Sequence, residues 1–168
     1  MRYSPLALAL SALIALSASS GPSDGQETID PRAASLEAIG RGALAAGDTL
    51  QANDAFEAAL AVDPGATPLL IDLAQAARRE GLQGKALHYY RAAMDREPKN
   101  LAAIAGEGEA LAEKGALEKA QRNLARLQGL CGADCAATRE LAAAIAKGAA
   151  PQVVSADELK PKDAVTAN

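Results

Sequence analysis

The stretch from Pro64 to Pro98, PGATPLLIDLAQAARREGLQGKALHYYRAAMDREP, decides the fold. Its two end prolines are 34 residues apart. Glycine and alanine recur at the same interval, at Gly47, Gly81 and Gly115 and at Ala52, Ala86 and Ala120. A fixed period of this length is typical of arrays whose units stack to bury a continuous core. We therefore predict three copies of one helical hairpin and an all-α fold.

The composition fits one soluble domain with a core of alanine and leucine. The chain has 168 residues and a net charge of -4, and 49% of its residues are apolar but only 2% aromatic. Few residues that suit a pleated sheet are present, which disfavours an all-β fold. The acidic balance also argues against a nucleic-acid partner, because such a partner requires a basic face that displaces counterions from phosphates.

The first 20 residues have the order of a secretory signal peptide. Arg2 precedes an apolar run from Leu6 to Leu16, and small residues follow up to Ser20. We predict cleavage near Ser19 or Ser20 and an exported, periplasmic mature chain. The alternative is an uncleaved membrane anchor, which is less favoured because the run has about 11 residues and a spanning helix needs about 20. Loss of Arg2 would leave 16 positive side chains against 21 negative ones, a net charge of -5.

Residues 30–148 form the predicted helical domain, between a flexible leader at 21–29 and a disordered tail at 149–168. The pairs Asp30-Pro31 and Thr67-Pro68 suit helix starts, because the polar side chain accepts from first-turn amides and proline needs no amide partner there. Asn100 is expected to cap the third unit without a proline. The predicted helices are 31–45, 49–62, 68–80, 84–96, 101–114 and 117–130, and an amphipathic capping helix at 135–147 closes the array.

Aligned at a period of 34, the sequence resembles the tetratricopeptide repeat (TPR) family. The first unit carries the resemblance through Leu36, Ile39, Gly40, Ala43, Ala52, Phe56, Ala59 and Pro64, and the second through Leu70, Leu73, Ala74, Ala77, Ala86, Tyr90, Ala93 and Pro98. The third unit matches at Ile104, Gly108, Leu111, Ala120, Leu124 and Leu127, but Glu107 replaces a core leucine and Gly132 replaces the closing proline. The resemblance implies a right-handed α-solenoid with repeats at about 33–66, 67–100 and 101–132. It also implies that Gly40, Ala74 and Gly108 are small where the second helix of each hairpin crosses.

Cys131 and Cys135 are the only cysteines and flank the predicted turn before the capping helix. In an oxidising compartment we expect them to form a disulfide that holds that helix in place. The alternatives are free thiols and a redox or metal site, although no second cysteine pair or histidine cluster is present. The sole histidine, His88, is expected to be an exposed helical side chain, so we predict a noncatalytic protein without a metal or cofactor.

In the TPR family, the first helices of the repeats line a concave groove. The resemblance places Arg41, Gln75, Arg78, Arg79 and Glu109 there, together with Glu37 and Glu113. We expect the three arginines to bind a carboxylate or an acidic peptide, and the alternative is an ordinary solvated helix face. The family's clamp for a terminal carboxylate is not expected, because its columns hold Glu37, Arg41, Asp72, Ala102 and Gly106. By analogy with small exported TPR proteins, the function expected is a scaffold for assembly of an envelope, pilus or secretion complex, with a protein or peptide partner. The rival functions are a thiol-active protein that uses Cys131 and Cys135 and a membrane-anchored assembly subunit.

Overall fold

The computed structural model describes residues 29–148, which form seven α-helices and no strand within that range. Each helix begins and ends within one residue of its predicted bounds, so the all-α prediction is confirmed. The predicted signal peptide, the leader up to residue 28 and the tail at 149–168 lie outside the described residues. The helices are α1 (Pro31–Ala46), α2 (Thr49–Val62), α3 (Thr67–Arg79), α4 (Gln83–Arg96), α5 (Leu101–Glu113), α6 (Leu117–Cys131) and α7 (Ala136–Gly148).

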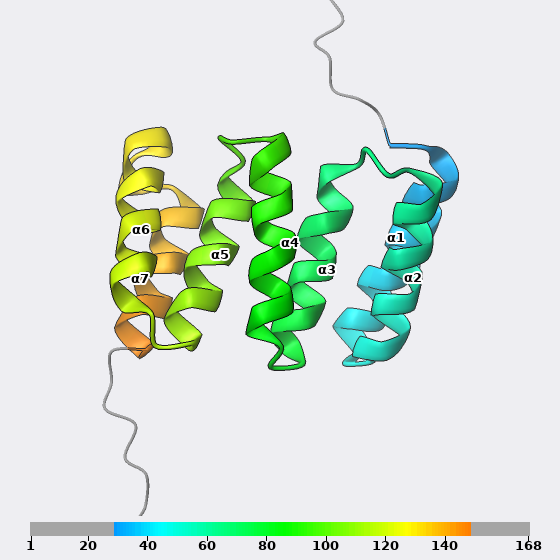
Figure 1. Ribbon diagram of the computed structural model, residues 1–168, viewed down its shortest axis with the longest axis horizontal. Coiled ribbons are helices and arrows are strands. Elements are labelled where there is room, and N and C mark those ends of the chain that lie inside the picture. The colour runs from blue at the N-terminus through cyan, green and yellow to red at the C-terminus, as the bar shows by residue number, and fades with distance from the viewer. Residues whose placement is uncertain (1–28, 149–168) are drawn as a thin grey trace, which may run out of the picture.

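The helices pair into three hairpins that stack side by side as a solenoid (Figure 1). α1 packs on α2, α3 on α4 and α5 on α6, and each hairpin also contacts the next one. α1 and α2 form one end of the array, and α6 and α7 form the other (Figure 1). No helix in residues 29–148 combines the length and the apolar character that crossing a bilayer requires.

The helix ends follow from local chemistry. Asp30 accepts a hydrogen bond from the amide of Arg32, and Asn100 accepts one from the amide of Ala103, which confirms both predicted caps. Each turn inside a hairpin contains a glycine with a positive φ, a conformation that costs other residues free energy. These glycines are Gly47, Gly81 and Gly115.

The predicted cap at Thr67 is wrong. α3 begins one residue earlier than expected, so Thr67 is a buried residue of its first turn, Ala66 holds the cap position, and no side chain caps the helix. The Thr67 hydroxyl instead lies beside the carboxylate of Glu97 and lowers the pKa of that group. The side chain thus contributes to a contact within the second repeat, between the start of α3 and the end of α4, which the local Thr-Pro pattern does not reveal.

Glycines let large side chains of a neighbouring helix approach the backbone. A Cβ added to Gly40 would lie 2.4 Å from a ring carbon of Phe56, and one added to Gly106 would lie 2.3 Å from the ring of Tyr90. Phe56 is fully buried and Tyr90 almost so. The core therefore consists of a few large side chains set into helices of small residues, as the composition predicts.

Two expectations about the repeat columns need correction. Ile39, which carries the resemblance in the first unit, is 55% exposed on α1, the first helix of the array, which no hairpin precedes within the described residues. At Gly108 the atoms nearest to an added Cβ belong to Leu141 of α7, at 2.6 Å, rather than to the second helix of its own hairpin. The third unit therefore makes its closest contact at this position with the capping helix.

α7 packs on both α5 and α6, as expected of a helix that closes the array. Leu141 is fully buried and belongs to a cluster with Ile104 and Leu127. A Cβ added to Gly148 would lie 2.9 Å from the carbonyl oxygen of Ala112, so the C-terminal ends of α5 and α7 are adjacent. The two helices thus run in the same direction, and α7 takes the place of the first helix of a fourth unit.

Candidate functional site

A groove of about 740 Å³ lies between α3, α5 and α7. α3 contributes polar and charged side chains at Gln75, Arg78 and Arg79. The lining residues of α5 are apolar or small near the N-terminal end of the helix and acidic near its C-terminal end, and α7 contributes small residues and one carboxylate. These residues are Leu101, Ala102, Ala105, Gly106, Glu109 and Glu113 on α5, and Ala136, Ala137 and Glu140 on α7; Tyr90 of α4 and Cys135 complete the lining.

The groove contains four of the five residues that the sequence places in a partner-binding groove. Gln75, Arg78, Arg79 and Glu109 line it, whereas Arg41 does not. α7 supplies residues that the sequence analysis did not assign to a site. Its contribution could be inferred only by treating the capping helix as the first helix of another unit.

Arg78 is bound by two carboxylates of the next repeat. Its Nη1 lies 2.5 Å from Oε2 of Glu109, its Nη2 lies 2.6 Å from Oε1 of Glu113, and its Nε donates to the other oxygen of Glu113 at 3.2 Å. Burial lowers the pKa of the guanidinium. Hydrogen bonds to Glu113 and Tyr90 and the charge of Glu109 raise it by a larger amount, so the pKa of Arg78 lies above its ordinary value. Burial in turn raises the pKa of the Tyr90 hydroxyl, and the adjacent Arg78 opposes that shift.

The other two arginines are also bound to acceptors of this chain. Nη1 of Arg79 donates to the carbonyl oxygen of Leu44 at 2.6 Å, which directs the guanidinium toward α1. Arg41 contacts Asp72 at 3.0 Å and Glu37 at 2.6 Å. Burial raises the pKa of Asp72 to about 6, although the hydrogen bond and charge of Arg41 act in the opposite direction.

These contacts change the chemistry expected of the groove. Its charged residues are Arg78 and Arg79 against Glu109, Glu113 and Glu140, two positive against three negative, and Arg78 is already matched by two of the carboxylates. Glu140 is exposed and has no ion-pair partner within residues 29–148. The arrangement therefore does not present three arginines to an acidic ligand.

A disulfide joins Cys131, the last residue of α6, to Cys135, which precedes α7, and their Cα atoms are 5.9 Å apart. Between them, Gly132 has a φ of 88° and ends α6, as the sequence predicts. The Thr138 hydroxyl donates to the carbonyl oxygen of Gly132 at 2.9 Å and lies 3.0 Å from Sγ of Cys135. The disulfide and Thr138 together hold the first turn of α7 at the edge of the groove.

Glu107, the residue that replaces a core leucine, is buried but hydrogen-bonded. One carboxylate oxygen accepts from Nε of Arg91 at 2.8 Å, and the other accepts from Nδ2 of Asn123 at 2.9 Å. Asn123 also donates to the carbonyl oxygen of Ile104. The carboxylate therefore connects α5 to α4 and α6, a structural role consistent with its position away from the groove lining.

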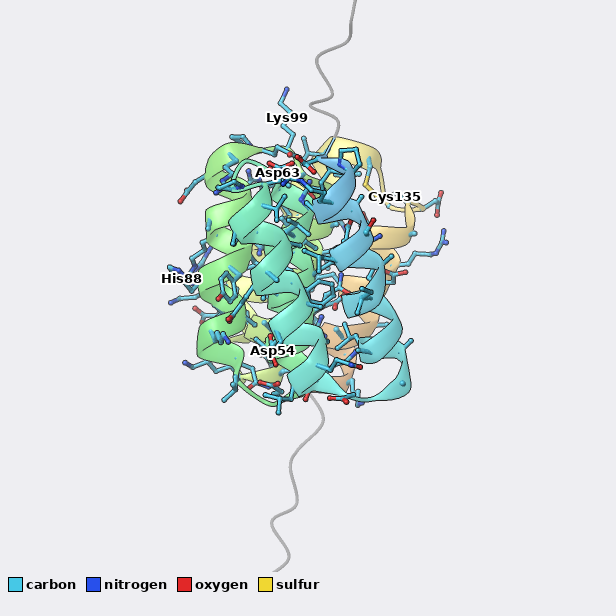
Figure 2. All side chains as sticks on the ribbon, turned by 90° about the vertical axis from the view of Figure 1, so that its right-hand side faces the viewer. Asp54, Asp63, His88, Lys99 and Cys135 are labelled. Atoms are coloured by element: carbon cyan, nitrogen blue, oxygen red, sulfur yellow. A yellow bond between two sulfur atoms is a disulfide. The ribbon has the colours of Figure 1, made fainter. Side chains whose placement is uncertain are left out.

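His88 is an exposed residue of α4 and lies on the opposite side of the molecule from Cys135 (Figure 2). The two residues therefore cannot act together in one site. Residues 29–148 contain no group of three or more side chains arranged to hold a metal ion.

Comparison with solved structures identifies the fold. The chain is similar to the first TPR domain of human RPAP3 (TM-score 0.61, 22% identity, covering 70% of this chain and 94% of that one). It is also similar to the TPR domain of Sgt2 from Aspergillus fumigatus (TM-score 0.62, 23% identity, 81% and 89% coverage). A third similar structure is the type III secretion chaperone SycD of Yersinia enterocolitica in complex with a peptide of the translocator YopD (TM-score 0.59, 21% identity, 68% and 87% coverage).

No protein-family profile matches the sequence, and no curated protein matches it. The structural similarities nevertheless agree with the 34-residue period and with the stacked hairpins. The chain has the fold of a TPR domain, as its sequence predicts.

Proposed function

We propose that this protein is a noncatalytic scaffold that binds a segment of a partner protein in the groove between α3, α5 and α7. The observation that carries the proposal is the groove itself, which has an apolar floor of small residues and charged groups along one end. Such a surface accepts side chains of a bound segment and provides polar groups that orient it. The peptide complex of SycD, a structure of the same fold, supports this assignment.

The lining residues suit binding more than catalysis. Ala102 and Ala136 are exposed at the floor of the groove and leave space for an incoming side chain. The ionisable groups beside them, Arg78, Glu109 and Glu113, are held in one ion-pair cluster. A residue used in proton transfer needs a pKa near the working pH, whereas the shifts at Arg78 and Tyr90 are directed upward from values that are already high.

We further propose that the mature protein acts in the bacterial envelope, in the assembly of an envelope, pilus or secretion complex. The order of charge, apolar run and small residues in 1–20 supports export. The Cys131–Cys135 disulfide suits an oxidising compartment. N-terminal sequencing of the protein from a periplasmic extract tests the proposal: a start near Ser20 supports it, whereas a chain that retains Leu6–Leu16 in the membrane fraction contradicts it.

Site-specific photocrosslinking in cells tests the groove. A photoreactive residue at position 102 is expected to give discrete crosslinked products, and Ala136→Trp in the same chain is expected to abolish them by filling the groove. The matched control places the photoreactive residue at position 125, because Ala125 is exposed on α6 and does not line the groove. The same products from positions 102 and 125, or products unaffected by Ala136→Trp, would exclude the groove as the binding site.

A further inference from the structure

The groove has two chemically different ends. On α5 the lining changes from Ala102 and Gly106 to Glu109 along the helix, and on α7 it changes from Ala136 to Glu140. The contacts of Leu141 with Gly108 and of Gly148 with Ala112 show that α5 and α7 run in the same direction and in register. With Leu141 beside Gly108, Ala136 lies level with about position 103 of α5 and Glu140 with about position 107. The apolar parts of the two helices therefore lie side by side, and Glu140 lies where the lining of α5 changes from apolar to acidic.

The acidic end carries negative charge that the protein does not neutralise. The positive charges of Arg78 and Arg79 stand against the negative charges of Glu109, Glu113 and Glu140, two against three, which leaves the lining with a net charge of -1. Arg78 is paired with Glu109 and Glu113, and Arg79 donates to the carbonyl oxygen of Leu44 on α1. Glu140 is exposed next to the apolar floor. Its sequence neighbour Arg139 donates to the carbonyl oxygen of Asp134. A ligand group that reaches Glu140 from the floor thus enters a region of net negative charge.

The spacing of the two ends limits the ligand further. Ala136 and Glu140 are four residues apart on one helix, which corresponds to about 6 Å along its axis. In an extended peptide, side chains two residues apart are separated by about 6–7 Å and point to the same side. An apolar side chain on the floor and a basic side chain two residues later would therefore match the two ends at once.

We propose that the groove selects a partner segment in which an apolar side chain is followed two residues later by lysine or arginine. The apolar side chain packs on Ala102, Ala136 and Ala137, and the basic group pairs with Glu140. This inference rests on the proposed function and gives its ligand the opposite charge to the acidic peptide expected from Arg41, Arg78 and Arg79. The groove thus discriminates by charge against segments that end in clustered carboxylates.

The test uses the oxidised mature chain, labelled with ¹⁵N, and three pools of degenerate ten-residue peptides. All pools have leucine at position 4, and position 6 is lysine, glutamate or serine. We expect the lysine pool to shift the amide signals of Ala102, Gly106 and Glu140 and to bind about fivefold more tightly than the serine pool, the range of one ion pair at a partly exposed site. The glutamate pool is expected to bind more weakly than the serine pool.

Two variants assign the charge preference to the groove. Glu140→Lys is expected to remove or reverse the preference for the lysine pool. Asp54→Lys makes the same change on α2, outside the groove, and is expected to leave the preference unchanged (Figure 2).

Three outcomes would overturn the proposal. Tighter binding of the glutamate pool, with shifts confined to the groove, would refute the ligand chemistry but keep the groove as a binding site. An equal effect of Glu140→Lys and Asp54→Lys would assign the preference to net charge and refute the role of Glu140. No groove shifts with any pool would contradict both this proposal and the peptide-binding function on which it rests.

Discussion

The docking of α7 through Leu141 and Gly108 provides the sharpest test of the structure. Leu141 is fully buried, and a Cβ on Gly108 would lie 2.6 Å from one of its methyl carbons. Truncation by Leu141→Ala removes a buried leucine and leaves a cavity, which should cost about 3 kcal/mol of unfolding free energy. Gly108→Ala should by itself be destabilising by about 1 kcal/mol, since overpacking costs about 2 kcal/mol and the gain in helix propensity offsets about 1 kcal/mol.

The two substitutions should not be additive. In the Leu141→Ala background, the new methyl group at position 108 enters the space that the leucine vacates, so the overpacking cost disappears and the gain in helix propensity remains. Gly108→Ala should then be stabilising by about 1 kcal/mol, which makes the coupling between the two sites about 2 kcal/mol. Urea denaturation followed by circular dichroism at 222 nm, on the wild type, both single variants and the double variant, measures this coupling.

A control isolates the effect of burial. Leu130 is 39% exposed on α6, so Leu130→Ala should cost about 1 kcal/mol or less. If Gly108→Ala has the same effect with leucine and with alanine at position 141, then Leu141 does not pack on Gly108 and the placement of α7 at the end of the groove is refuted.

Three further predictions concern other parts of the molecule. Burial raises the pKa of Asp72 to about 6, so the neutral form of this carboxyl group is favoured in the folded state. The stability that this group contributes should be complete below about pH 4 and should be lost as the pH rises through 6. Urea denaturation at a series of pH values measures this dependence, and Asp72→Asn should remove it. Replacing Cys131 and Cys135 with serine should lower the unfolding free energy by about 2 kcal/mol and accelerate amide hydrogen exchange in α7, because a five-residue loop is no longer closed. Unchanged exchange would refute the role of the disulfide in holding α7 in place. Arg91→Met should lower the melting temperature in thermal denaturation more than Glu107→Leu does. The first change leaves the side chain of Glu107, only 11% exposed, without its charged partner, whereas the second leaves Arg91, which is 54% exposed and can be solvated.

The sequence predicted the helices well because proline, glycine and capping residues act locally. The two prolines, the turn glycines and the capping residues together place the ends of α1 to α6 to within one residue. The error at Thr67 has the opposite origin: its hydroxyl lies beside Glu97, the residue that ends α4 of the same repeat, and this contact competes with the local cap. Local patterns therefore predict helix ends reliably only where no residue distant in the sequence offers the capping side chain another partner.

The candidate site was predicted less completely, because its chemistry depends on distances between helices. The sequence places Gln75, Arg78, Arg79 and Glu109 on the groove face, and the lining includes all four. It does not show that Arg78 is bound by carboxylates 31 and 35 residues later, or that α7 supplies the groove with Glu140. The periodicity predicts which face a residue occupies, but not whether its charge is already matched across that face.

The two close approaches to α5 have a consequence for how the array unfolds. Gly106 lies against Tyr90 of α4, and Gly108 lies against Leu141 of α7, so side chains from both neighbouring units press on the same short helix. Two glycines lower the intrinsic helicity of α5 by about 2 kcal/mol relative to alanine. A helix that has low intrinsic helicity and depends on contacts from both sides couples the unfolding of the units that it contacts. α5 should therefore make the second hairpin and the capping helix melt in a single cooperative transition, where an array of self-sufficient repeats would fray one unit at a time.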